Sequence, residues 1–144
     1  MVEIRTCTAN DFEQVFLLLQ QLWPEEALCR ERLRDVYGRG ITSDAQRYLC
    51  AVAESRIAGF CSMTFKNSIR AEGLLANIDE MVVHHANRGR GIGSQLLQAA
   101  IASATERGCA RVELESAFRR VEAHAFYERR GFQNRAYYFS LPLV

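Results

Sequence analysis

Three glycines at alternate positions separate a strand-like run from a helix-like run. Gly89, Gly91 and Gly93 are interleaved with Arg88 and Arg90 in the string RGRGIGS. The first amides of a helix have no partner inside the helix and, with the positive end of the helix dipole, they attract anions. Glycine lets a phosphate approach the backbone because it has no Cβ. The string therefore predicts a phosphate-binding turn.

The spacing of the glycines separates the known classes of phosphate-binding turn. A P-loop requires GxxxxGK[ST], and the chain has no such string. A dinucleotide-binding turn requires GxGxxG and an acidic residue about 20 positions later. Glu113 and Glu115 meet the second condition, but Ser94 stands where the third glycine belongs. The chain left after the turn is also too short to complete a doubly wound domain, so this alternative is disfavoured.

Two carboxylates precede the turn on a strand-like run, ANIDEMVV. Side chains on a strand alternate between its two faces, so Asn77 and Asp79 are expected on one side, with Met81. Glu80 is expected on the opposite side. A carboxylate can take up a proton or hold an ammonium group, whereas the amide of Asn77 cannot act as a base. The histidines and Asp79 do not have the spacing of metal ligands, and no metal site is predicted.

Hydrophobic periodicity predicts the elements that hold these residues in place. Their order is β-α-α-β-β-β-α-β-α-β, which predicts a mixed α/β (α+β) sheet with helices on both faces in a single domain over residues 1–144. The expected strands lie near the N-terminus and over residues 47–53, 57–66, 74–83, 110–116 and 136–144. The expected helices cover residues 12–22, 25–38, 92–107 and 121–131.

Two motifs together resemble the GNAT superfamily of N-acetyltransferases. RGRGIG matches its R/Q-x-x-G-x-G/A signature, and FYERRGF, which contains Tyr127, matches its F-Y-x-x-x-G-F. The similarity covers nearly the whole chain, and the late-helix form RR-x-x-AH-x-FY resembles the aminoalkylphosphonate and aminoglycoside acetyltransferases. The resemblance implies a mixed, mostly antiparallel sheet whose fourth and fifth strands splay apart, with acetyl-CoA in the gap.

The resemblance also implies roles for individual residues. Backbone amides of the glycine turn would hold the CoA pyrophosphate, Met81 and Val83 would bond the pantetheine arm, and an amide near Val82 or Val83 would stabilise the oxyanion. Tyr127 would protonate the leaving thiolate. Asp79 is the leading candidate for the base and Glu80 the second, with water as the alternative. The implied cofactor-binding residues are Met81, Val82, Val83, Arg88, Gly89, Arg90, Gly91, Ile92, Gly93, Ser94 and Tyr127.

The expected activity is direct transfer of the acetyl group of acetyl-CoA to a primary amine of a small molecule. No covalent acyl-enzyme is expected, because none of the five cysteines has a charged neighbour that would activate it. The alternative is a non-catalytic acyl-CoA-binding or regulatory module on the same fold. This alternative stays open because many members of the family carry a glutamate where this chain has Asn77.

Other features of the sequence bear on the partners, the location and the oligomeric state of the protein. A formal net charge of +1 gives no reason to expect a nucleic-acid or membrane partner. An odd number of cysteines and a charged N-terminus favour reduced thiols in the cytoplasm. The apolar last strand favours a homodimer. The roles of Arg119, Arg120 and His124 stay open between function and surface charge or packing, as does the identity of the acceptor.

Overall fold

A computed structural model describes all residues, Met1–Val144. The chain forms two compact units, Met1–Glu113 and Leu114–Val144. The strands are β1 (Val2–Thr6), β2 (Gln46–Ala53), β3 (Arg56–Ser68), β4 (Gly73–Val83) and β5 (Arg111–Leu114). The helices are α1 (Phe12–Leu22), α2 (Arg30–Ile41), α3 (Ile92–Glu106) and α4 (Val121–Arg129), with 3-10 turns η1 (Ala9–Asp11) and η2 (His85–Asn87).

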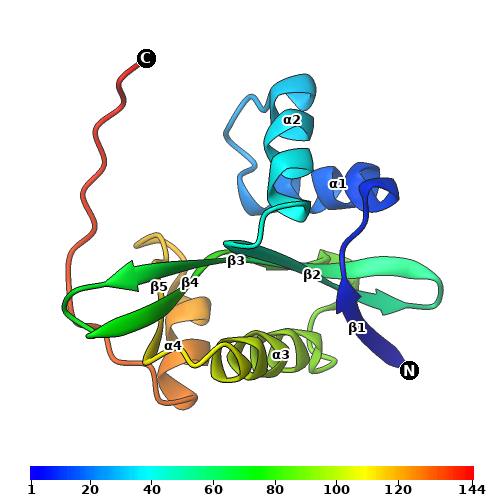
Figure 1. Cartoon of the computed structure of the whole chain (residues 1–144). Coiled ribbons are helices and arrows are strands. Elements are labelled where there is room, and N and C mark those ends of the chain that lie inside the picture. Colours follow the sequence, from blue (N-terminus) through cyan, green and yellow to red (C-terminus); the bar gives the residue numbers. More distant parts are fainter. The chain divides into compact units, whose positions relative to one another are not determined.

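The strands form one sheet in the sequential order β1-β2-β3-β4-β5. The first four strands are antiparallel, and β5 lies parallel to β4 because α3 carries the chain back to the starting end of β4. Helices α1 and α2 lie on one face of the sheet and α3 on the other (Figure 1). This confirms the predicted mixed sheet with helices on both faces.

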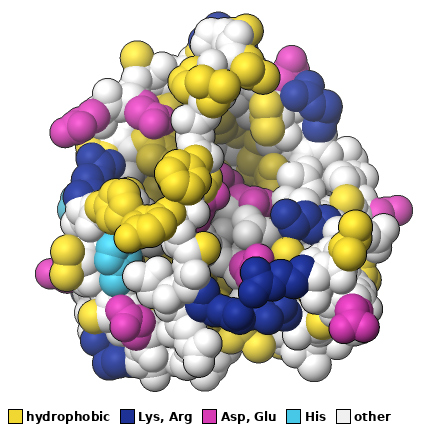
Figure 2. Space-filling view, turned by 90° about the vertical axis from the view of Figure 1, so that its left-hand side faces the viewer, with side chains coloured by type: hydrophobic (Ala, Val, Ile, Leu, Met, Phe, Trp, Pro, Cys, Tyr) yellow, Lys and Arg dark blue, Asp and Glu magenta, His cyan; other side chains and the backbone are white.

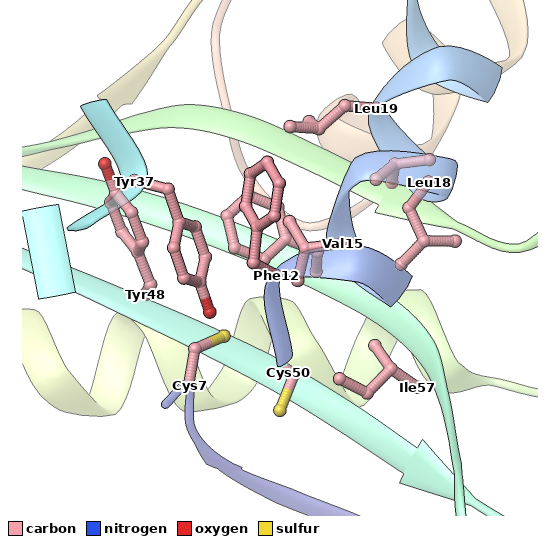
Figure 3. Packing of buried hydrophobic residues seen from close by; sticks show 11 residues of the cluster. Cys7, Phe12, Val15, Leu18, Leu19, Tyr37, Tyr48, Cys50 and Ile57 are labelled. Carbon is pink, nitrogen blue, oxygen red and sulfur yellow. The ribbon is translucent and has the colours of Figure 1, made fainter. Parts of the chain in front are cut away.

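Two apolar layers define the faces of the sheet. On one face, the apolar side of α1 lies in one buried cluster with Tyr48, Phe60 and Val82 of the sheet, and this cluster also holds Cys7 and Cys50 (Figure 3). On the other face α3 approaches the sheet so closely that a Cβ added at Gly59 would lie 2.8 Å from the side chain of Leu96. Even-numbered residues in the middle of β3 therefore face α1, and odd-numbered residues face α3.

Helix α2 differs from the prediction at both ends. It begins at Arg30 instead of residue 25, and it continues through Gly38 to Ile41. Gly38 was expected to end the helix, but it has open space around it and an ordinary helical position. Gly40 is the glycine that packing requires, because a Cβ there would overlap the ring of Tyr48. Helix α2 therefore reaches the sheet through its last turn.

The predicted last strand, residues 136–144, is wrong for this chain. No strand follows Leu114, and the expected strand 110–116 is limited to Arg111–Leu114. Tyr137 and Phe139 are 80% and 88% exposed. A strand needs a neighbour for its backbone N–H and C=O groups, so apolar residues alone do not make one.

No helix combines the length and the apolar character needed to cross a bilayer.

Candidate functional site

A β-bulge interrupts the pairing of β3 with β4 at Asp79. Ser62 lies opposite Glu80, whereas the next residue, Met63, lies opposite Ile78, so Asp79 has no partner across the ladder. An extra residue on one strand changes the phase of the side-chain alternation at that point. The side chains before and after Asp79 are therefore not related by simple alternation.

The bulge brings the two candidate carboxylates to one face of the sheet. The hydroxyl of Thr64 donates to Oδ2 of Asp79 at 2.5 Å, and the hydroxyl of Ser62 donates to Oε1 of Glu80. Ser62 and Thr64 are two residues apart on β3 and share its α1 side. The prediction that Asp79 and Glu80 lie on opposite faces is therefore wrong, because it assumed unbroken alternation along β4.

Neutral donors hold the half-buried carboxylate of Asp79. Besides the Thr64 hydroxyl, Nδ2 of Asn77 donates to Oδ1 of Asp79 at 2.7 Å. Asp79 takes part in no ion pair. The pKa of Tyr48 is raised, chiefly by burial and then by the negative charges of Glu80 and Asp79. Asn77, which cannot be a base, thus orients the carboxylate that can.

Sequence reasoning missed Ser62 and Thr64, although the sequence carried a signal for them. Along β3 the α1-facing positions Ser62, Thr64 and Lys66 are polar, while Met63 and Phe65 between them are apolar and buried. This alternation is typical of a strand with one side against a core and the other lining a polar site. The hydroxyls on this side are the donors to the two carboxylates.

The glycine turn leaves open space beside the start of helix α3. Gly89 and Gly91 have φ values of +80° and +79°, which favour glycine, and a Cβ at either would meet no atom within 4 Å. Helix α3 starts directly after Gly91, and its first helical hydrogen bond runs from the Gln95 amide to the Gly91 carbonyl at 3.1 Å. The amides of Ile92 and Gly93 precede that bond and have no acceptor inside the helix.

This turn fits the pyrophosphate of CoA. An exposed loop with open space above two left-handed glycines lets an anion reach the first amides of α3, and the buried side chain of Ile92 fixes the start of the helix. Arg90 is exposed, and Arg88 donates through Nε to the Val83 carbonyl at 3.3 Å. Arg88 therefore ties the turn to the end of β4.

The end of β4 extends past β5. The Ala110 amide donates to the Leu74 carbonyl at 2.8 Å, which sets β5 level with the start of β4. Strand β5 has only 4 residues against the 11 of β4, so the segment Met81–Val83 continues beyond the end of β5. The last residues of β4 therefore have no partner in β5, at the place where the resemblance implies a gap between these strands.

Tyr127 lies in the second unit, on α4, and is 8% exposed. Its ring makes edge-on contacts with Phe126 and Phe132, with centroid distances of 5.3 and 5.7 Å. The Phe132 amide donates to the Tyr127 carbonyl at 3.2 Å, after the left-handed Gly131 has ended the helix. The motif FYERRGF thus builds a small aromatic cluster around the phenol.

His124 and Arg120, whose roles the sequence left open, form hydrogen bonds with residues near them in the sequence. Nε2 of His124 donates to the Ala117 carbonyl at 2.9 Å, and the His124 amide donates to the Arg120 carbonyl at 3.1 Å. The second bond is the first helical hydrogen bond of α4, since Arg120 is the N-cap residue of this helix. The first bond ties the His124 ring to the loop before the helix.

One group of metal-ligand types lies close together: the ligand atoms of Cys7, Asp11 and Cys50 are all within 4.8 Å of one another. Both oxygens of Asp11, however, accept hydrogen bonds from the Arg5 guanidinium, at 2.8 and 3.0 Å. A bound metal cation would have to displace the guanidinium group of Arg5 from Asp11. The group is therefore an ion pair beside two buried thiols.

Comparisons with known proteins agree with this geometry. The model of the acetyltransferase (GNAT) family matches residues 12–132. An aminoalkylphosphonate N-acetyltransferase of Salmonella typhimurium is 29% identical over 98% of this chain and 91% of its own length. A probable glucosamine 6-phosphate N-acetyltransferase of Oryza sativa is 31% identical over 91% of this chain and 81% of its own length.

A solved structure, described as a transcriptional regulator from Bacillus halodurans, is 28% identical and has a TM-score of 0.87. The match covers 99% of this chain and 100% of the Bacillus halodurans chain. With the family model spanning both the glycine turn and the FYERRGF motif, these likenesses extend over both units. The chain belongs to the acetyltransferase (GNAT) family, and it is an N-acetyltransferase that moves an acetyl group from acetyl-CoA to an amine.

Proposed function

We propose that the acceptor is the primary amine of a small molecule and that it attacks acetyl-CoA directly within a ternary complex. The observation that carries this proposal is the bulge at Asp79, which sets two carboxylates side by side on the α1 face. The substrates named for two relatives are an aminoalkylphosphonate and glucosamine 6-phosphate, both small amines. These names support a small amine here.

Asp79 is proposed as the base. An amine must lose a proton to become nucleophilic, and a carboxylate in hydrogen-bond reach can accept it or pass it to water. The Thr64 hydroxyl and the Asn77 amide hold both oxygens of Asp79 without neutralising their charge. Glu80, bonded to the Ser62 hydroxyl, is the second candidate. The same charges would hold the substrate as an ammonium before the proton is lost.

Tyr127 is proposed as the acid. A phenol has an ordinary pKa of about 10, which suits proton donation to a departing thiolate. The nitrogen–carbon bond forms as the carbon–sulfur bond breaks, the sulfur takes a proton from the phenol, and the amine proton goes to Asp79. Amides near Val82 and Val83 are the proposed donors to the carbonyl oxygen. Amides from Arg88 to Ser94 are proposed to hold the pyrophosphate, and Met81 and Val83 the pantetheine arm.

The buried thiols support transfer without a covalent intermediate. Burial raises the pKa of Cys61 above that of an ordinary thiol, and a hydrogen bond with Cys50 raises the pKa of Cys7. The bond from Cys7 lowers the pKa of Cys50, but this thiol is fully buried. An acyl-accepting cysteine must be both ionised and accessible, and none of these three is.

Release of CoA thiol in the presence of amines tests the proposal. We expect acetyl-CoA to raise the melting temperature, because it binds the native state, and at least one small primary amine to release thiol. Binding of acetyl-CoA without thiol release from any amine would instead favour a non-catalytic or regulatory module. The description of the Bacillus halodurans relative as a transcriptional regulator makes that outcome worth measuring.

Two further properties are proposed: location in the cytoplasm and a homodimer. All five cysteines are free, and free thiols persist in a reducing compartment. Figure 2 shows exposed apolar side chains. The large exposed apolar residues among the last eight are Tyr137, Tyr138, Phe139, Leu141, Leu143 and Val144. A second copy is the proposed cover for this segment. A monomeric mass in light scattering would exclude the dimer.

A further inference from the structure

A pocket of about 290 Å³ lies at the end of the β3–β4 hairpin, within the first unit. Leu75 supplies an apolar part of its wall, and the rest is polar. Its polar lining residues are Lys66, Asn67, Ser68, Arg70, Arg111 and Glu113. The volume would hold a group the size of a phosphate together with a few waters.

The charges of this pocket are unbalanced. Arg111 pairs with Glu113 at 3.5 Å, while neither Lys66 nor Arg70 has an ion pair. Figure 2, which views the molecule from the side of the β3–β4 turn, shows Lys and Arg side chains gathered on this face. Three cations around a single carboxylate give a surface that attracts anions.

Lys66 links the pocket to the carboxylate site. It follows Thr64 by two residues on β3, so both project from the α1 face of the strand, about 7 Å apart. Thr64 in turn donates to Asp79 at 2.5 Å. A small molecule whose amine lies at Asp79 would therefore extend along β3 toward Lys66. The chain has no other lysine.

We propose that the Lys66 pocket binds a phosphorus oxyanion, phosphonate or phosphate, carried by the acceptor amine. The inference rests on the proposed function and adds the chemical class of the acceptor. An amine at one end of the molecule meets the negative charge of Asp79, and an oxyanion at the other end meets the positive charge of Lys66 and Arg70. Opposite charges at the two ends fix the direction in which the acceptor binds.

The phosphate groups of CoA are a second source of the same chemistry, and a binding experiment separates the two sources. Reductive ¹³C-methylation labels Lys66 and the N-terminal amine alone and preserves their charge, so each gives one NMR signal. With saturating CoA present, methylphosphonate should shift the Lys66 signal saturably and leave the N-terminal signal unchanged. Arg70→Ala should weaken that response.

Three outcomes of this titration would overturn the inference. The Lys66 signal could stay unchanged with methylphosphonate; it could respond to CoA alone and to nothing added afterwards; or acetate could shift it as strongly as methylphosphonate. The second outcome would assign the pocket to CoA, and the third would make it a general anion site.

Kinetics provide the second test. For Lys66→Met we expect KM to rise about 10- to 100-fold for 2-aminoethylphosphonate or glucosamine 6-phosphate, the loss typical of a charged hydrogen bond. KM for ethanolamine and glucosamine, which lack the phosphorus oxyanion, should stay unchanged, as should acetyl-CoA binding. Arg56→Met is the matched control, because Arg56 is an exposed cation at the opposite end of β3.

The two proposals fail in different ways. If none of the tested amines makes the unaltered protein release CoA thiol, the proposed function fails. If it acetylates amines but prefers those without a phosphorus oxyanion, or if Lys66→Met affects amines with and without the oxyanion equally, acetyl transfer stands and the phosphorus-oxyanion pocket is overturned.

Discussion

Asp11 and Asp79 belong to the same unit of the molecule, but only Asp11 is neutralised by a cationic side chain of the protein. Asp11, at the end of η1, is buried and accepts two hydrogen bonds from the Arg5 guanidinium and one from the Thr8 amide at 2.7 Å. Asp79, on the bulge of β4, accepts only from a hydroxyl and an amide. Arg5 lowers the pKa of Asp11 by hydrogen bonding to its ionised form.

The difference teaches which carboxylate is available for chemistry. The charge of Asp11 is cancelled inside the fold, so Asp11 contributes to stability and has little left to offer a ligand. Neutral donors orient the carboxylate of Asp79 and leave its charge for a cation from outside the protein. A substrate ammonium is such a cation. The following substitutions test this division, from the largest expected effect to the smallest.

Asp79→Asn should lower kcat by about 1000-fold, within the range typical for loss of a general base, with little change in melting temperature. The amide keeps the shape of the side chain and cannot accept the proton. Steady-state release of CoA thiol measures the effect, and Glu80→Gln is the paired variant. If Glu80→Gln carries the loss and Asp79→Asn does not, the base is Glu80.

Tyr127→Phe should lower kcat by about 100-fold, as expected for loss of a general acid, while the Kd for acetyl-CoA stays the same. Tyr37 is the matched control: its phenol donates to the Thr8 carbonyl at 2.7 Å, beside the buried Asp11. Tyr37→Phe should cost stability without lowering kcat. Equal kcat for Tyr127→Phe and the unaltered protein would remove Tyr127 as the acid.

Asp11→Asn should lower the free energy of unfolding by about 2 kcal/mol, the size of a lost charged hydrogen bond. The melting temperature should fall by about 4–8 °C for a chain of this length. At a temperature where both proteins are folded, kcat should be unchanged. A large fall in kcat at full stability would contradict the division between the two aspartates.

The stability difference between Asp11→Asn and the unaltered protein should depend on pH in one direction. The folded pKa of Asp11 is lowered, so the ionised form adds stability above the unfolded pKa of about 3.9. That stability is lost as the pH falls through the folded pKa. Melting curves should show the difference in full at pH 7 and should converge in acid; a difference that stays constant would disprove this linkage.

Gly91→Ala and Gly108→Ala compare a glycine of the proposed CoA site with a glycine of similar backbone geometry outside it. Both have positive φ, +79° and +76°, and open space around the Cβ position. Each substitution should cost about 1 kcal/mol of stability through backbone strain. Only Gly91→Ala should also weaken CoA binding, by about tenfold, or about 1.4 kcal/mol, as calorimetry would show. Equal CoA affinity in the two variants would place the pyrophosphate elsewhere.

The sequence determined the parts of this protein that local chemistry controls. Positive φ at Gly89 and Gly91 requires glycine, the apolar stripe of α3 requires a sheet to cover, and FYERRGF ends α4 at a left-handed Gly131. The strands from β2 to β4 and helix α1 lie within one or two residues of their expected bounds. These features depend on residues that are close together in the sequence, so the sequence alone is enough to predict them.

The tertiary structure decided what depends on partners far along the chain. Strand pairing placed the bulge at Asp79, which turned Glu80 to the same face and brought in Ser62 and Thr64 as donors. Residues 136–144 form no strand, although their composition favours one, because a strand also needs a pairing partner and composition cannot supply it. The side chains of β3, β5 and the hairpin turn meet in the Lys66 pocket only after folding. Strand register and the pockets between strands are properties of the assembled sheet, and no single segment encodes them.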